Sequence, residues 1–152
     1  MAWHMGWMGR SGTVLVLAAG LLHTAGAQEL RSGTLKTVQG SVEVSKGDTR
    51  RVAAPGGPVA EADRIVTAAG GSAVILLRDG TLITVGPNSQ VDITRFQFDS
   101  TTQTGSLTVQ VLLGTIRMVT GLLGKLQPEN VKVLTPSSTV SVRGTDFIVE
   151  VP

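Results

Sequence analysis

Hydrophobic and polar residues alternate over short segments along most of the chain. Segments rich in Val, Ile, Thr and Leu are separated by glycines or short polar clusters every 6 to 12 residues, which predicts many short β-strands. No window shows the 3.6-residue apolar repeat of an amphipathic helix. The residues expected on buried strand faces are Val38, Val42, Val44, Val91, Ile93, Leu107, Val109, Val111, Leu113, Ile116, Met118, Val131 and Val133.

The clearest predicted element is a β-hairpin around Asp79 and Gly80. An Asp-Gly pair tolerates the two positive φ values that a tight type I′ turn requires, so residues 74–78 should pair with residues 81–85. Residues 86–89, with the sequence Gly-Pro-Asn-Ser, should form the next turn.

The predicted core contains small and β-branched aliphatic side chains and few large rings, which suits thin, closely stacked sheets. We therefore expect an all-β fold, with many short strands in a β-solenoid or roll, or alternatively in an irregular β-sandwich. Two polar stretches, residues 49–58 and 99–106, are expected to be surface loops or long turns. They are not domain boundaries, because neither flank could bury a core alone.

The first 27 residues have the order of a secretory signal peptide. They contain one basic residue, then an apolar run over residues 13–22, and then the small residues Ala25 and Ala27 before Gln28. This order predicts cleavage between Ala27 and Gln28.

An uncleaved membrane anchor is the alternative for this segment. An anchor needs about 20 apolar residues, and the apolar run has only 10, residues 13–22. We therefore assign residues 1–27 to a signal peptide and residues 28–152 to one all-β domain. The processed protein is expected in the periplasm or outside the cell, with no membrane span.

Residues 28–152 contain no His, Cys, Trp or Tyr. Catalysis by a nucleophile with an imidazole base, a zinc site of the usual kind and a thiol redox centre each need one of these residue types. We therefore predict no catalytic residue, no metal ligand and no cofactor. A hydrolase that uses two carboxylates is the least favoured alternative.

The charge of the predicted domain does not favour a nucleic-acid partner. Without Arg10, the 13 basic residues of the chain become 12, against 11 acidic ones. Arg50 and Arg51 are the only adjacent basic pair, and no basic stripe that could bind phosphates is present. We expect no nucleic acid among the partners.

Leu122 and Leu123 stand between two glycines after a strongly apolar stretch. The region from 111 to 126 is expected to form two strands that flank a turn. If the leucines fold inward, they cap the end of the core, which is the interpretation we favour. If they are exposed, they form a contact for a partner protein.

The C-terminal segment "STVSVRGTDFIVEV" changes the parity of its apolar positions. Val140 and Val142 are even-numbered, whereas the apolar residues after Asp146 are odd-numbered. One extra residue must be absorbed between them, which predicts a β-bulge at Gly144 and Thr145, with Arg143 and Asp146 close enough to pair. We interpret the bulge as architectural; the alternative is that it turns Arg143 and Thr145 toward a partner.

Four stretches resemble the FecR-type extracytoplasmic domain. They are "GSVEV" (40–44), "ADRIVT" with "SAVILLRDGTLITVGPNSQVDI" (62–93), "LTVQVLLGTIRM" (107–118) and "VKVLTPSSTVSVRGTDFIVEV" (131–151). The most specific part is the closing Thr-Pro followed by Val-Arg-Gly-Thr-x-Phe. One position departs from the family pattern, which has Gly where this chain has Ala62.

The resemblance implies a regulatory or binding role and no catalytic residues. In the founding members of the family, such a domain follows a membrane helix and responds to the signalling domain of an outer-membrane receptor. We therefore expect an exported, non-enzymatic module that binds another envelope protein, through Arg143 and the two leucines or by strand addition. The alternative is a structural domain of an envelope or surface assembly.

Overall fold

The computed structural model describes residues 31–152, so the predicted signal peptide and its cleavage site lie outside the described residues. Twelve strands make up most of this region, and two short helical turns interrupt them near the C-terminus. The strands are β1 (Arg31–Gln39), β2 (Val42–Lys46), β3 (Thr49–Val52), β4 (Pro58–Ala60), β5 (Arg64–Thr67), β6 (Ser72–Leu77), β7 (Leu82–Val85), β8 (Gln90–Asp99), β9 (Thr104–Val119), β10 (Val131–Leu134), β11 (Thr139–Ser141) and β12 (Asp146–Val151). The helical turns are α1 (Leu122–Leu126) and the 3-10 turn η1 (Pro128–Asn130).

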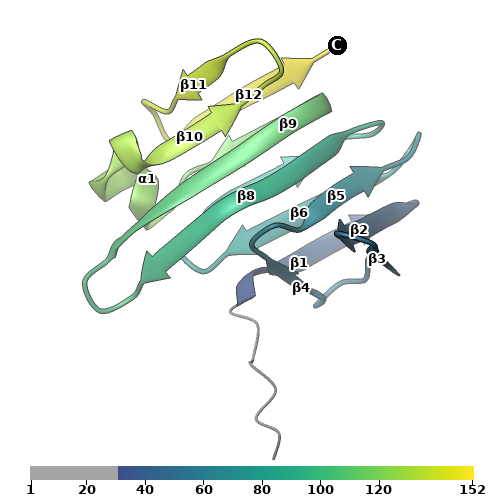
Figure 1. Ribbon diagram of the computed structural model, residues 1–152, viewed down its shortest axis with the longest axis horizontal. Coiled ribbons are helices and arrows are strands. Elements are labelled where there is room, and N and C mark those ends of the chain that lie inside the picture. Colours follow the sequence, from purple (N-terminus) through teal and green to yellow (C-terminus); the bar gives the residue numbers. More distant parts are fainter. Residues whose placement is uncertain (1–30) are drawn as a thin grey trace, which may run out of the picture.

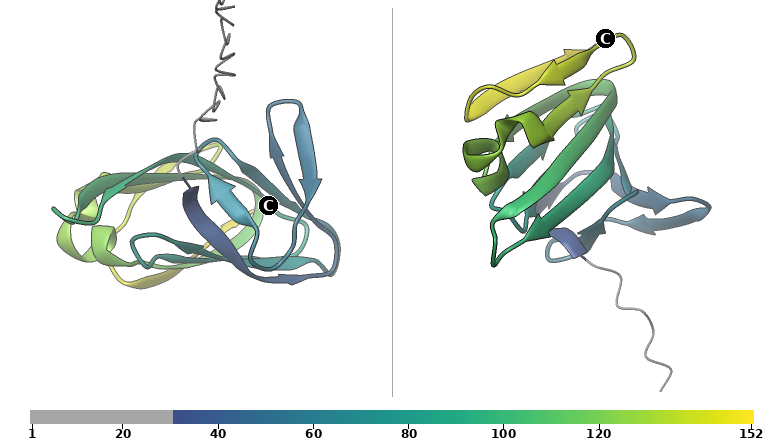
Figure 2. Two further views of the ribbon diagram at one scale, coloured as in Figure 1. Left: turned by 90° about the horizontal axis from the view of Figure 1, so that it is seen from below. Right: turned by 60° about the vertical axis from the view of Figure 1, so that its left-hand side comes forward.

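The strands form two sheets that face each other and share one strand, β9 (Figures 1 and 2). We call the first the β8 sheet; its order is β3-β2-β5-β8-β9-β10-β11. The second, the β6 sheet, has the order β4-β1-β6-β7-β9-β12. The first part of β9 pairs with β8 and β10, and its last part pairs with β7 and β12.

The prediction of an all-β fold is confirmed. Successive coils of a parallel β-solenoid would pair in parallel, whereas every strand pair described here is antiparallel except that of β9 with β10. The strands instead curl into a half-barrel (Figure 2, left), which corresponds to the roll among the expected architectures. Its core is aliphatic, as expected, and Phe96 is the only aromatic side chain among the buried hydrophobic residues of the described region.

A glycine lets β9 pass from one sheet to the other. Leu107, Val109 and Val111 are buried before the crossing, and Ile116 and Met118 are buried after it, so the inward face changes parity. Gly114 lies between these groups with φ +88°. A Cβ atom at this position would lie 2.1 Å from the Ser89 Oγ, so both the backbone angle and the space favour glycine here.

The hairpin predicted around Asp79 is present, but its turn is of a different type. Strand β6 pairs with β7, with Leu76 opposite Leu82. Of the two turn residues, Gly80 has a positive φ, +86°, and Asp79 does not, whereas a type I′ turn needs both. The turn is closed by a hydrogen bond from the Gly80 N–H to the Leu77 carbonyl at 3.0 Å.

Three further expectations along the chain have different outcomes. The turn predicted at residues 86–89 is observed between β7 and β8. Of residues 99–106, only 100–103 form the turn between β8 and β9, because Asp99 ends β8 and residues 104–106 begin β9. Residues 49–58 are not simply a loop, because β3 occupies the first four of them and pairs with β2.

The bulge predicted at Gly144 and Thr145 is wrong. Strand β11 ends at Ser141 and pairs with β10 in the β8 sheet, whereas β12 begins at Asp146 and pairs with β9 in the β6 sheet. The intervening residues are a crossing between the sheets, in which Gly144 has φ +138°. The parity change is real, but it arises because the two segments are strands of different sheets and not one continuous strand.

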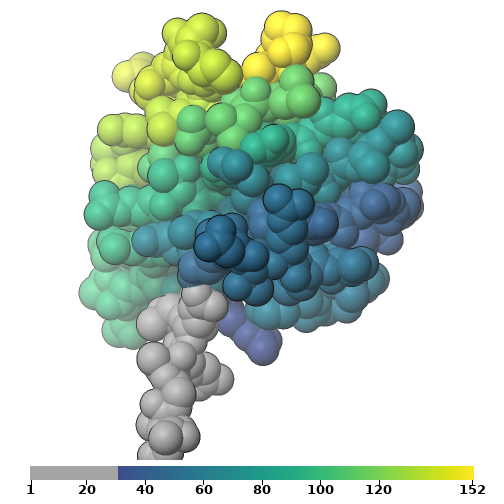
Figure 3. All heavy atoms as spheres, turned by 45° about the vertical axis from the view of Figure 1, so that its right-hand side comes forward, coloured from purple at the N-terminus to yellow at the C-terminus, as the bar shows by residue number. Residues whose placement is uncertain are grey.

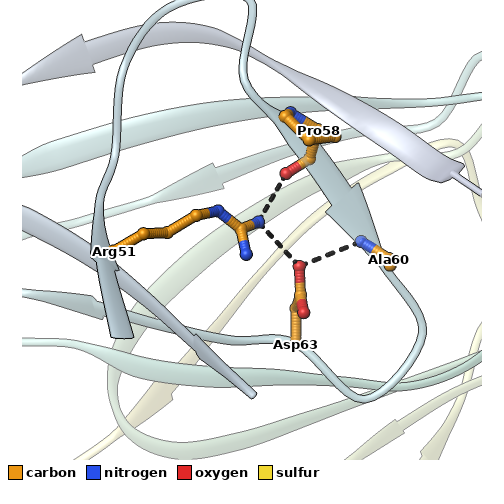
Figure 4. A network of polar contacts seen from close by, with 4 residues as sticks. All are labelled: Arg51, Pro58, Ala60 and Asp63. Carbon is orange, nitrogen blue, oxygen red and sulfur yellow. Dashed lines mark hydrogen bonds and ion pairs between the residues drawn. The ribbon is translucent and has the colours of Figure 1, made fainter. Parts of the chain in front are cut away.

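A buried carboxylate holds the turn between β4 and β5 (Figure 4). The Asp63 Oδ2 accepts hydrogen bonds from the Arg51 Nη2 at 2.9 Å and the Ala60 N–H at 3.0 Å, and the same Arg51 nitrogen donates to the Pro58 carbonyl at 2.6 Å. The chain enters this turn through Ala62, which has φ +70°. A side chain in that conformation is strained, which explains why the family pattern has Gly at this position.

Replacement of Ala62 by Gly should raise the free energy of unfolding by roughly 0.5 to 1 kcal/mol. The substitution removes the strain of a left-handed residue, about 1 to 2 kcal/mol, and adds the smaller entropic cost of glycine in the unfolded chain. Ala69→Gly is the control, because Ala69 is exposed and has no positive φ and should lower stability. Urea unfolding of both variants measures the difference; equal destabilisation by the two would contradict the strain at Ala62.

Replacement of Gly114 by Ala should lower the free energy of unfolding by about 3 kcal/mol, through backbone strain and overlap with Ser89. Gly70→Ala isolates the backbone term, because Gly70 has φ +73° and a Cβ atom at that position would meet no other atom within 4 Å. It should cost about 1 to 2 kcal/mol. Thermal or urea unfolding that finds the two variants equally stable would show that β9 does not need the close approach of Ser89.

Candidate functional site

The two sheets separate where the chain ends, and a groove lies between their edges. Strand β11 is the outer strand of the β8 sheet there, and β12 is the outer strand of the β6 sheet. The groove has a volume of about 740 Å³ and is lined mainly by β11, β12 and the residues that precede them. Figure 3 shows it as the gap between the yellow-green and yellow parts at the top of the molecule. We call it the β11–β12 groove.

The floor of the β11–β12 groove is a part of the hydrophobic core that is only partly covered. Phe147, Val149 and Val151 point toward the core and pack against it, yet each stays only half-buried. All three residues of β11 are exposed, so that strand does not cover them. An apolar strip is therefore open to solvent along the inner side of β12.

The outer side of β12 carries a further exposed apolar residue. Ile148 is 66% exposed, in a row between Asp146 and Glu150. A single exposed apolar residue is common on protein surfaces, so no signal in the sequence marks this edge.

Arg143 lines the groove and has no polar partner within residues 31–152. Its side chain is exposed and makes no hydrogen bond or ion pair in this region. The predicted pair with Asp146 is wrong, because that carboxylate binds Arg117 on β9, with Oδ1 to Nε at 2.9 Å and Oδ2 to Nη2 at 2.6 Å. These hydrogen bonds lower the pKa of Asp146 below its usual value.

Thr120, which directly follows β9, anchors the crossing to the β6 sheet. Thr120 donates its N–H to the Thr145 carbonyl at 2.9 Å and its hydroxyl to the Gly144 carbonyl at 3.2 Å. The Thr145 side chain is exposed beside Arg143. The crossing therefore has a fixed path, from which the Arg143 side chain projects at the rim of the groove.

The two adjacent leucines lie away from this groove and have different environments. Leu123 is fully buried in the core, so the predicted partner contact at this residue is wrong and the cap interpretation holds. Leu122 is half-buried. The region from 111 to 126 is one strand followed by α1 and not two strands.

Asp79 connects this cap to the hairpin. Its Oδ2 accepts from the Thr81 hydroxyl at 2.8 Å and the Leu123 N–H at 3.3 Å, and its carbonyl accepts from the Leu122 N–H at 2.8 Å. Asp79 is buried, and its carboxylate is used to hold two turns together.

A second hollow of about 760 Å³ lies beside Phe96 and Phe98. Its arginine is already engaged: the Arg78 guanidinium lies 5.6 Å from the centre of the Phe96 ring and donates to the Phe98 carbonyl at 3.4 Å. The β11–β12 groove differs because its arginine has no partner in the described region and lies beside two sheet edges. We therefore take the groove as the candidate functional site.

Four carboxylates of the described region have structural partners. Asp63 binds Arg51, Asp79 binds backbone and hydroxyl groups, Asp92 binds Arg64 at 2.6 Å, and Asp146 binds Arg117. In the described part of the chain, no three acidic or histidine side chains come close enough to hold a metal ion. The groove offers apolar contacts, unpaired backbone groups and one cation, which suit the binding of an extended peptide segment.

No helix within residues 31–152 has the length and apolar character needed to cross a membrane.

Comparison with known proteins identifies the family. A solved structure titled "Cell surface anchoring domain" is 30% identical over 41% of this chain and 83% of that chain, with a TM-score of 0.39. The search of curated proteins found no match. Residues 63–151, which run from the Asp63 turn through β12 and contain most of the groove, match the family model described as "FecR protein". Because this match covers more than half of the 152 residues, the chain belongs to the FecR family.

Proposed function

We propose that the protein is an exported, non-enzymatic interaction module of the cell envelope that serves regulation or signalling. Its β11–β12 groove binds an extended segment of another envelope protein, and by analogy with the family that protein is a receptor with a signalling domain. The observation that carries the proposal is the half-exposed apolar strip of Phe147, Val149 and Val151 between two sheet edges.

Two physical terms favour a bound strand at this place. A strand that joins a sheet edge completes backbone hydrogen bonds, and its alternate side chains enter the space beside the edge. Here those side chains would cover the apolar strip and complete the core. Family membership supports a role in the envelope, since FecR domains are extracytoplasmic.

A photoreactive amino acid at Ile148 should give a covalent adduct with a defined envelope protein when the variant is produced in its own cells. The same amino acid at Val52 is the matched control, because Val52 is a similarly exposed aliphatic residue, 85% exposed, on the opposite sheet edge β3. Immunoblots should show the adduct from position 148 and not from position 52.

Arg143→Glu in the Ile148 probe protein should weaken that adduct several-fold, because the variant reverses the charge at the rim of the groove. Arg143 is exposed and has no polar partner among the described residues, so the fold should be unaffected. Equal adducts from positions 148 and 52, or an adduct insensitive to the charge at Arg143, would contradict the groove as the binding site.

If the predicted signal peptide is cleaved, the exported protein begins at Gln28. Both tryptophans of the chain, Trp3 and Trp7, precede that residue, and the chain contains no tyrosine. The exported protein should therefore have no tryptophan emission, and its N-terminal peptide in mass spectrometry should begin at Gln28. Tryptophan fluorescence from purified exported material would show that the N-terminal segment is retained.

A further inference from the structure

We propose that the partner segment adds to β12 and not to β11, runs antiparallel to it, and carries a basic residue toward Glu150 and an acidic residue toward Arg143. The inference rests on the proposed function, which states only that the groove binds an extended segment. It adds which sheet edge the segment joins, in which direction the segment runs relative to β12, and which charges the segment carries.

The four sheet edges of the described region differ in how they resist strand addition. Natural sheets protect their edges with short strands, prolines and charged side chains. Strand β3 carries Arg50 and Arg51, β4 has three residues and begins with Pro58, and β11 also has only three residues. Strand β12 has six residues, of which four are apolar and two, Asp146 and Glu150, are acidic; it contains no proline, lysine or arginine, and Arg117 pairs with Asp146. It is the least protected edge.

The length of β12 sets the length of the paired part of the segment. Six residues in a strand span about 20 Å, and the groove runs along β12 to Pro152. Antiparallel pairing is favoured because it is slightly more stable per residue than parallel pairing. A paired part of about six residues would thus place three side chains inward, against the apolar strip, and three outward.

The charges along β12 define a polarity. Asp146 is neutralised by Arg117, which leaves Glu150 toward the C-terminal end of the strand and Arg143 just before its start. Neither of these two side chains makes an ion pair or hydrogen bond with another described residue. In an antiparallel segment, the basic residue therefore comes first and the acidic residue last.

The same charges disfavour a second copy of the chain as the occupant. A two-fold antiparallel pairing centred on Ile148 would place Glu150 of each copy opposite Asp146 of the other, whose carboxylate already pairs with Arg117. Two carboxylates would then share one arginine at each end of the pair, and Glu150 would gain no basic partner of its own. A segment with the complementary pattern gives Glu150 such a partner.

The test uses a labelled peptide, Val-Lys-Val-Ile-Val-Thr-Gly-Ser-Glu, with Gly-Ser flanks for solubility. Its first six residues match β12 with the Lys opposite Glu150, and its final Glu reaches the level of Arg143. The control peptide exchanges the Lys and the Glu and so has the same composition. By fluorescence anisotropy at low salt, the purified protein should bind the first peptide about tenfold more tightly than the second. In the double variant Arg143→Glu/Glu150→Lys, which changes two exposed residues, this preference should reverse.

Hydrogen exchange locates the bound strand. Addition of the first peptide should slow the exchange of amides in residues 146–151 and leave those of residues 139–141 unchanged. Protection of β11 instead of β12, or a peptide preference that the double variant does not reverse, would overturn the edge and polarity proposed here while the groove stays a binding site. An absence of binding by both peptides would also overturn this proposal.

The proposed function has its own separate test in the Ile148 adduct. A dimer in sedimentation that Ile148→Asp dissociates would overturn the present inference in favour of a second copy. Monomeric protein that binds the first peptide supports it.

Discussion

The path of β9 through both sheets is the constraint on which the rest of this structure depends. Its first part holds β8 and β10 in one sheet, and its last part holds β7 and β12 in the other. The two parts meet at Gly114, where the backbone angle and the contact with Ser89 both require a residue without a side chain. The same bend sets the distance between β11 and β12, because each reaches the groove by pairing, directly or through β10, with a different part of β9. Fold and candidate site thus have a common geometric origin.

Much of the local structure could be predicted from alternation and turn chemistry. The alternation of inward and outward positions within a strand, the hairpin around Asp79 and the turn before Ser89 depend on near neighbours in sequence. Of the core positions predicted from this alternation, Leu113 is an exception, since it is 46% exposed. Long-range pairing could not be predicted in this way. The apolar parity changes between Val111 and Ile116 and again between Val142 and Phe147; the first change occurs within one bent strand, and the second separates strands of different sheets. The spacing of apolar positions in the sequence is the same in both cases, because it shows only that the inward side changes from odd-numbered to even-numbered residues or the reverse.

The candidate site was predicted in part, for a related reason. Arg143 was identified as a residue that could face a partner, and the structure leaves it exposed at the rim of a groove. Phe147, Val149 and Val151 were expected to be buried, because a sequence does not show that the opposite sheet ends before it covers them. Leu123 is buried, as the favoured cap interpretation expected; the flanking glycines had left an exposed contact open as the alternative, and the buried Asp79 carboxylate fixes this turn against the core.

The position of β9 late in the chain also affects the order in which the protein can fold. Strands β1 to β8 form hairpins and two partial layers, but the strand that both sheets share is absent until residues 104–119 are available. Folds dominated by such distant pairings form slowly, so the chain is expected to stay open through most of its synthesis. Under the proposed export, slow closure would be an advantage, since it prolongs the time in which the chain can be transported before it becomes compact.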